Sequence, residues 1–224
     1  MSTAGTEKTV REGSTEKRTA ILAAARDLFV RQGVDRVSMD AVAARAGVSK
    51  RTVYDYFGDK RRLFLAILSA ASESMLATSR RALDEHLPAD VRITTVPQLE
   101  QAFTALAIDL GASIVGSTDY AAAFALVAQQ RLQTPTTQDD LATDAASREL
   151  TERIAHFVDA GLLDTDNPRL AADHFSALTI LLAYERQPVP ATVDPEKVRQ
   201  IMVDGVHAFI RAYATREESA PAPG

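Results

Sequence analysis

Apolar residues recur at helical spacing along most of this 224-residue chain, and this periodicity constrains the fold more than any other feature. Between residues 15 and 32, for example, the apolar side chains fall on one face of an α-helix: Ile21, Leu22, Ala25, Leu28 and Phe29. Short alternating β-branched runs joined by Asn-Gly or Gly-Gly turns, which would indicate strands, are nearly absent. The sequence therefore predicts an all-α protein of about nine helices.

One segment has the pattern of two short helices joined by a tight turn. Ser38 and Ser49 are good N-cap residues for helices over 39–46 and about 50–56. Gly47, between them, can adopt the left-handed conformation that such a turn requires. The second helix would present Lys, Arg, Thr and Tyr side chains that can donate to DNA phosphates or reach base edges in a major groove. Helix-turn-helix geometry also occurs in proteins that never touch DNA, but aromatic hydroxyls beside Lys and Arg favour phosphate contact.

The rest of the chain is predicted to form a second helical unit. A long helix begins after its cap, Asp59, and fades near Leu87. Further helices are predicted near 97–115, 119–132 (capped by Thr118), 138–160, 168–186 and 195–214. Residues 1–14 and the tail 215–224 are polar, without a periodic apolar face, and are predicted to be disordered. These boundaries predict an N-terminal domain over 15–75 and a larger domain over 76–214.

Charge is distributed unevenly along the chain, whose formal net charge is -5. Residues 1–66 carry 13 Lys and Arg against 8 Asp and Glu, whereas the remainder carries 12 against 22. A basic end on an acidic body indicates that the N-terminal part meets a polyanion.

No motif of an enzyme, cofactor site or membrane span is present in the sequence. The chain has no cysteine, which excludes disulfides, thiolate nucleophiles and thiolate metal sites. It has no GxSxG elbow, phosphate-binding loop, dinucleotide fingerprint or His-Glu-x-x-His, and its four histidines (86, 156, 174 and 207) lack metal-ligand spacing. We therefore expect no catalytic residue, no metal, no cofactor and no membrane partner, and a cytoplasmic protein.

The residues from Ala43 to Lys60 follow the pattern Ala-x-x-Ala-Gly-Val-Ser-x-x-Thr-x-Tyr-x-Tyr-Phe-x-x-Lys. This pattern resembles the signature of the TetR family of bacterial repressors, and the helix before it and the Leu63-Phe64 pair after it also match. The resemblance implies a homodimer that binds double-stranded, palindromic operator DNA through the N-terminal domain. It implies DNA contacts for Ser38, Lys50, Tyr54, Tyr56 and Lys60. The outward side and N-terminus of the second motif helix add Ser49, Arg51, Thr52 and Asp55 to the predicted DNA-binding residues.

Two positions on the second motif helix depart from what is usual in that family. Arg51 stands where Gly is frequent, and it has the reach for a bidentate contact with a guanine edge. Asp55 is unusual on a DNA-facing helix. It would either orient Arg51 or Lys50, or accept a hydrogen bond from a cytosine amino group, and the sequence leaves these roles open.

The resemblance also implies that the larger domain binds a small apolar or amphipathic ligand and dimerises through its last two helices. A ligand that tilts the long helix would change the spacing of the two recognition helices and release the operator. Candidates for the ligand pocket are Phe103, Leu106, Asp109, Leu110, Phe124, Val127, Arg131, His156, Phe157, His174 and Phe175. Candidates for the dimer interface are Leu178, Leu182, Ile201, Met202 and Phe209. A place in the core is the alternative for each of them.

Two other readings remain open beside a ligand-released repressor. One is a DNA-binding regulator that has no small-molecule ligand. The other is an activator, because the direction of regulation depends on where the operator lies.

Overall fold

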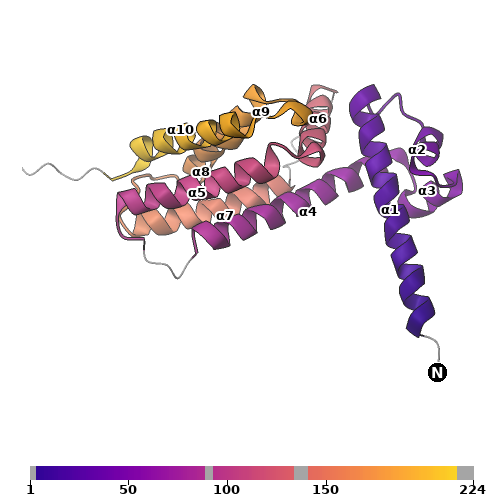
Figure 1. The fold of residues 1–224 in the computed structure, drawn as a ribbon, viewed down its shortest axis with the longest axis horizontal. Coiled ribbons are helices and arrows are strands. Elements are labelled where there is room, and N and C mark those ends of the chain that lie inside the picture. Colours follow the sequence, from indigo (N-terminus) through magenta and orange to yellow (C-terminus); the bar gives the residue numbers. More distant parts are fainter. Residues whose placement is uncertain (1–3, 89–92, 134–140, 216–224) are drawn as a thin grey trace, which may run out of the picture. The chain divides into compact units, whose positions relative to one another are not determined.

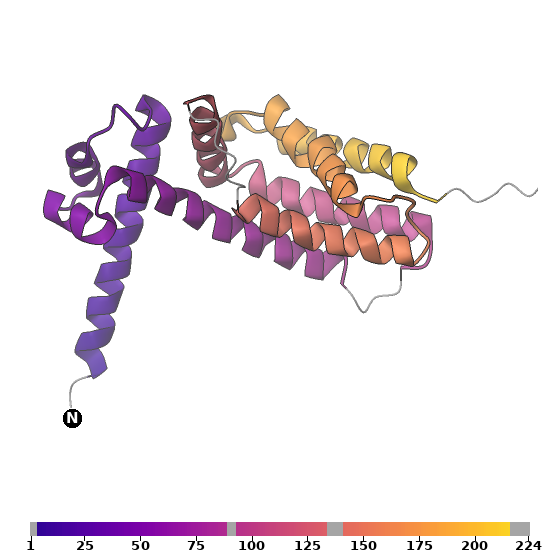
Figure 2. The ribbon, with the colours of Figure 1, turned by 180° about the vertical axis from the view of Figure 1, so that it is seen from behind.

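The computed structural model describes residues 4–88, 93–133 and 141–215, and within these ranges nine helices form the fold and no strand is present. Figure 1 shows their arrangement, and Figure 2 shows it from behind. The first seven helices are α1 (Ala4–Gln32), α2 (Met39–Ala46), α3 (Lys50–Phe57), α4 (Lys60–His86), α5 (Val96–Ile114), α6 (Thr118–Gln133) and α7 (Leu141–Asp159). The eighth runs without a break through α8 (Pro168–Ser176), a π-helical turn (Ala177–Leu181) and α9 (Leu182–Arg186), and the ninth is α10 (Pro195–Tyr213). The predicted all-α class is confirmed.

The chain folds into two compact units, and two helices contribute to both. The first unit comprises the chain up to Ala71 and a segment that begins at Ala122 in α6. The second unit comprises residues 72–121 and the chain after the first unit's second segment. The sequence predicted two contiguous domains, and it did not foresee that α6 returns to the first unit, where Leu126 is fully buried in the core.

The first unit is built around a core shared by α1, α2, α3 and the beginning of α4. Its buried side chains include Phe29, Val42, Val53, Phe57 and Phe64, and the rings of Phe29 and Phe64 lie 6.4 Å apart. Burial of these apolar faces supplies most of the free energy that holds such short helices in place.

Helix α1 begins at Ala4, so the predicted disorder over 1–14 does not hold from Ala4 onward. Extending a helix costs much less free energy than nucleating one, and the buried part of α1 supplies the nucleus. The predicted tail falls outside the described residues except for Thr215, whose amide donates to the carbonyl of Leu162 (3.1 Å).

The second unit is a helical bundle in which α5 packs on α10 and α7 packs on α8. Figures 1 and 2 both show α5, α7, α8 and α10 alongside one another. The ring of Phe103 lies at the centre of this bundle, 5.3 Å from Phe175, 5.4 Å from Phe209 and 6.1 Å from Phe157. Aromatic rings at such distances and tilts fill a core closely.

This core contains several residues for which other roles were predicted. Met202 and Phe209 were predicted at a dimer interface, but both are fully buried inside their own protomer. The predicted pocket residues Phe103, Leu106, Leu110, Phe157 and Phe175 are also buried. A long apolar residue on a helical face looks the same in sequence whether it meets the protomer's core, a ligand or a second subunit.

Helix α10 packs closely against the π-helical turn. A Cβ atom added to Gly205 of α10 would lie 2.3 Å from the carbonyl oxygen of Leu178 in that turn. The hydroxyl of Thr179, which is fully buried, donates to the carbonyl of Phe175 (2.6 Å). The predicted helix over 168–186 is thus present but contains one widened turn, which the sequence pattern did not indicate.

Helix α6 is capped one residue earlier than predicted, because the amide of Tyr120 donates to the side chain of Ser117 (3.4 Å) and Thr118 is the first helical residue.

Among the described residues, no single helix is long and apolar enough to cross a membrane, although α5 and the first part of α6, bent by 82°, reach those limits together.

Candidate nucleic-acid interface

The two short helices of the first unit begin and end as the sequence predicted. The Oγ atom of Ser38 accepts from the amide of Ala41 (3.1 Å), and the Oγ atom of Ser49 accepts from the amide of Thr52 (3.0 Å). Gly47 has a φ angle of 68°, in the left-handed region. Ser38 and Ser49, which were predicted to bind DNA, therefore also serve as helix caps.

Helix α3 has one buried side and one exposed side. Val53 and Phe57 are buried in the core of the first unit. At about 100° per residue, Arg51 and Asp55 lie about 160° and 200° around the helix from Val53, on the opposite side. The side chain of Arg51 is 91% exposed and that of Asp55 is 66% exposed.

The other polar residues of α3 lie on its two flanks. Lys50 and the exposed Tyr54 are on one flank, and the half-buried Thr52 and Tyr56 are on the other. Arg51 and Asp55 therefore form the outermost line of the exposed side of α3, called its crest below. Hydroxyl and ammonium groups lie on either side of this crest.

Each charged residue of α3 is paired with an opposite charge. The ammonium of Lys50 lies 2.8 Å from a carboxylate oxygen of Asp40 in α2, and this hydrogen bond and the charge of Asp40 raise the pKa of Lys50. Arg51 lies 3.7 Å from Asp55, one turn along the same helix. The sequence left open whether Asp55 orients Arg51 or Lys50, and the structure pairs it with Arg51.

Two of the predicted DNA-binding side chains are engaged in the fold of the first unit. The hydroxyl of Tyr56 lies 2.8 Å from the hydroxyl of Ser14 in α1. The ammonium of Lys60 donates to the backbone carbonyls of Asp35 (2.9 Å) and Val37 (3.2 Å), in the loop between α1 and α2. These contacts were not predicted, because they join residues more than twenty positions apart.

The hydroxyl of Thr52 lies 2.7 Å from that of Ser49, so both groups are occupied at the helix N-terminus. Within the described part of the chain, the hydroxyl of Tyr54 has no hydrogen-bond partner in the protein. The exposed, outward side of α3 is therefore formed by Lys50, Arg51, Tyr54 and Asp55.

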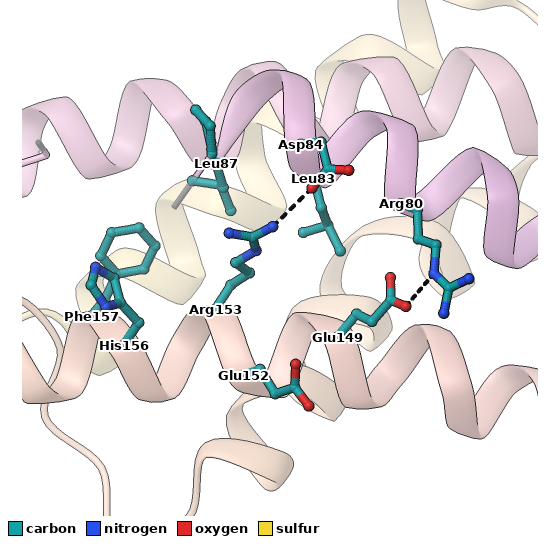
Figure 3. A pocket seen from close by; sticks show the side chains of 10 residues that line it. Arg80, Leu83, Asp84, Leu87, Glu149, Glu152, Arg153, His156 and Phe157 are labelled. Carbon is teal, nitrogen blue, oxygen red and sulfur yellow. Dashed lines mark hydrogen bonds and ion pairs between the residues drawn. The ribbon is translucent and has the colours of Figure 1, made fainter. Parts of the chain in front are cut away.

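The second unit has a groove between α4 and α7, with a volume of about 510 Å³. Figure 3 shows that two ion pairs cross it, one between Arg153 and Asp84 (2.9 Å) and one between Arg80 and Glu149. Its apolar lining comes from Leu83, Leu87 and Phe157, and Pro88, Glu152 and His156 also line it. Of the predicted ligand residues, His156 and Phe157 line this groove.

Asp109, the most anomalous polar residue of the predicted pocket, is instead tied to α4. The guanidinium of Arg81 donates to both its carboxylate oxygens (2.8 and 2.9 Å), and Nε2 of His86 lies 3.1 Å from one of them. The hydrogen bond from Arg81 holds the pKa of Asp109 below its usual value, against the opposing effect of burial.

A group of three possible metal ligands, Glu85, His86 and Asp109, is brought together at this point. Sequence spacing did not reveal it, because Asp109 comes from a different helix. Arg81 already occupies both oxygens of Asp109, so a cation would have to displace a guanidinium from its carboxylate.

The remaining predicted ligand and dimer residues are scattered. His174 is exposed and bonds the hydroxyl of Tyr213, and Phe124 is half-buried. Val127 and Arg131 lie outside the residues whose side chains the structure describes. Leu178, Leu182 and Ile201 are half-buried. Leu170, which was not predicted, is about half exposed (46%) on α8, and Leu181 is about half exposed (50%) in the π-helical turn.

Two family models match the chain. Residues 21–67 match the model of bacterial regulatory proteins of the tetR family, and residues 111–215 match the C-terminal domain of AefR-like transcriptional repressors.

Curated relatives are similar to less than a third of the chain. The HTH-type transcriptional activator FasR of Mycolicibacterium smegmatis is 40% identical over 68 residues, which are 30% of this chain and 31% of FasR. The DNA-binding transcriptional repressor TetR of Mycobacteroides abscessus is 46% identical over 55 residues, which are 25% of this chain and 29% of that protein. The chain therefore matches less than a third of the length of these relatives.

Solved structures match nearly the whole chain. A TetR-family regulator from Mesorhizobium loti superposes with a TM-score of 0.67 at 21% identity and covers 90% of this chain and 98% of its own. The flavonoid-responsive regulator FrrA superposes with a TM-score of 0.61 at 26% identity, with the same two coverages. The signature on α2 and α3, the helical fold and both family models agree, and the chain belongs to the TetR family of bacterial regulatory proteins.

Proposed function

We propose that this protein is a transcriptional regulator that binds a palindromic operator as a homodimer. The observation that carries the proposal is the exposed side of α3, where Arg51 and Asp55 project directly away from the buried Val53 and Phe57. In helix-turn-helix proteins the second helix lies in the major groove, and its polar side chains contact base edges and phosphates. The basic charge of residues 1–66 supports this placement.

We propose repression as the direction of regulation. The C-terminal family model, which covers 105 residues from 111 to 215, is that of a repressor domain. One curated relative is an activator and another is a repressor, so the likeness to these relatives does not decide the direction. A protein that binds chromosomal DNA acts in the cytoplasm of a bacterium.

The exposed apolar residues of α8 and the π-helical turn support dimerisation. Leu170, Ala177 and Leu181 are exposed and follow helical spacing, and Leu178 and Leu182 are half-buried beside them. A second copy of the chain would remove this apolar surface from water.

We propose further that a small amphipathic molecule acts as inducer by binding the groove between α4 and α7. Its volume of about 510 Å³ lies within the usual range of ligand pockets, roughly 300–1,000 Å³. Its lining combines apolar and charged side chains, which suits a molecule with one apolar and one polar part. Helix α4 belongs to both units, so a change in its position would reach the DNA-binding unit. The similarity to a flavonoid-responsive regulator supports a ligand but does not identify it.

Selection of bound duplexes from a random pool tests the DNA-binding proposal. We expect an inverted repeat whose half-site centres are about one helical turn apart, roughly 34–36 Å, or a multiple of it. Enrichment of no sequence at all would contradict the proposal.

A thermal-shift screen with small molecules tests the inducer. We expect a molecule that raises the melting temperature and also weakens operator binding at fixed salt. Molecules that stabilise the protein without changing operator affinity would contradict induction, although not DNA binding.

A further inference from the structure

We infer that Arg51 and Asp55 act as one recognition unit that reads a G·C base pair in the major groove. This inference rests on the proposed DNA-binding function and names the base pair that two of its residues recognise. The unit offers two hydrogen-bond donors from the guanidinium followed by one acceptor from the carboxylate.

The position of the pair on α3 supports direct base contact. Arg51 and Asp55 lie on the crest of the helix, opposite Val53 and Phe57, and they are among its most exposed side chains (91% and 66%). When a recognition helix enters a groove, the crest reaches deepest and the flanks face the phosphates. Lys50 and Tyr54 on one flank are therefore placed for the backbone rather than for the bases.

The pairing of the charges supports joint action. Lys50 forms an ion pair with Asp40 (2.8 Å), whereas Asp55 lies 3.7 Å from Arg51. The hydroxyls of Ser49 and Thr52 bond each other, and that of Tyr56 bonds Ser14. No other two polar side chains of α3 in the described structure share the crest and face each other.

The distance between the two groups matches the edge of one base pair. Their Cα atoms are about 6 Å apart along the helix axis, at about 1.5 Å per residue, but the side chains converge to 3.7 Å. On a G·C edge, guanine O6 and cytosine N4 are hydrogen-bonded to each other and so lie about 2.9 Å apart. A guanidinium and a carboxylate in contact can therefore address both bases of one pair.

The order of donors and acceptors selects G·C over the alternatives. Guanine presents the acceptors N7 and O6, and cytosine presents the amino donor N4. The guanidinium of Arg51 would donate to N7 and O6 while the carboxylate of Asp55 accepts from N4. An A·T pair places the adenine amino donor where the second donor of Arg51 points, so two donors would face each other. A C·G pair presents the same groups in reversed order.

The test measures base preference in the full-length protein and four variants. For each position of a selected half-site, the affinity for all four base pairs is measured with the wild type, Arg51→Ala, Asp55→Ala, Asp55→Asn and Asp40→Ala. We expect the wild type to prefer G·C at one position by about ten- to a hundredfold. Arg51→Ala and Asp55→Ala are expected to abolish the preference at that same position and to leave the other positions unchanged. Asp55→Asn, whose carbonyl still accepts a hydrogen bond, is expected to retain part of it.

Asp40→Ala is the matched control, because it removes a carboxylate that pairs with a cation of α3 but lies off the crest. It should leave every base preference unchanged.

Asp55→Ala is also expected to change the affinity for random DNA. Loss of a negative charge near phosphates should tighten its binding to random DNA while its discrimination falls, which a structural defect would not produce.

Three outcomes would overturn the inference: a preferred pair other than G·C, an unchanged preference in Asp55→Ala, or effects of Arg51→Ala and Asp55→Ala at positions more than one base pair apart. Sequence-specific binding would still stand in each of them, whereas failure of the wild type to select any DNA would overturn the proposed function itself.

Discussion

At the scale of single residues, the partner of a side chain decides whether it holds the fold or faces a ligand. Lys50 and Lys60 have the same chemistry and were both predicted to contact DNA. Lys50 is exposed and paired with another exposed side chain, Asp40, whereas Lys60 donates to two backbone carbonyls that precede α2. We therefore expect the two lysines to respond differently to substitution.

Lys60→Met should lower the free energy of unfolding by about 1–2 kcal/mol, because it removes two charge-assisted hydrogen bonds to the loop between α1 and α2. Lys50→Met should weaken DNA binding and leave the unfolding transition where it is, since exposed ion pairs add little stability. Urea denaturation and DNA affinity, measured on both variants, separate the two roles. Equal unfolding midpoints for wild type and Lys60→Met would contradict this account.

Asp109 should make stability depend on pH. Its pKa is lowered in the folded protein, chiefly by Arg81, so it stabilises the fold above its ordinary value of 3.8, and this contribution is lost as pH falls through the lower, folded-state value. Asp109→Asn should cost about 1–2 kcal/mol at pH 7, after allowance for the half-exposed Arg81. Urea titrations from pH 7 to pH 3 should show the gap between wild type and variant closing below about pH 4. A gap that stays constant would show that Arg81 and Asp109 do not stabilise the folded state through this charge.

At the scale of helices, close packing of α10 on the π-helical turn depends on the absence of a side chain at Gly205. Gly205→Ala should destabilise the protein by about 2–3 kcal/mol, because the clash with the Leu178 carbonyl outweighs the higher helix propensity of alanine. Gly116→Ala is the control, since a Cβ atom there meets no other atom within 4 Å. Thermal unfolding of the two variants decides the matter, and similar melting temperatures would show that α10 can move away at no cost.

Local signals predicted the helices of the DNA-binding unit well, and long-range packing accounts for what they missed. Caps at Ser38 and Ser49 and the turn at Gly47 fixed α2 and α3 to within one residue, because such signals act over three or four positions. The return of Leu126 to the first core, the π-helical turn and the bonds of Lys60 all join distant segments. The exposed side of α3 was predictable because Val53 and Phe57 mark the buried side of a short, capped helix. The burial of Met202 and Phe209 was not predictable, because the apolar stripe of α10 could pack on the protomer's own core, a ligand or a second subunit.

At the scale of the whole molecule, binding both halves of a palindromic operator requires two copies of the chain. Sedimentation should give a mass of twice 24.2 kDa. Leu181→Glu should shift the equilibrium toward monomer, because it places a charge where an apolar contact is expected. Leu65→Glu is the control, because Leu65 on α4 is equally exposed (49%) but lies outside the proposed interface. A monomeric wild type, or equal effects of the two substitutions, would contradict the proposed dimer surface.

If the polar side of α3 enters DNA, the affinity for the operator depends on salt concentration, and titrations over a range of salt concentrations measure this dependence. The logarithm of the association constant should fall linearly with the logarithm of salt concentration, with a slope of about −0.9 for each phosphate contact. Lys50→Met should reduce the steepness by about 2 for a dimer, one contact in each half-site. A wild-type affinity that does not change with salt, or an identical slope in the variant, would contradict the claim.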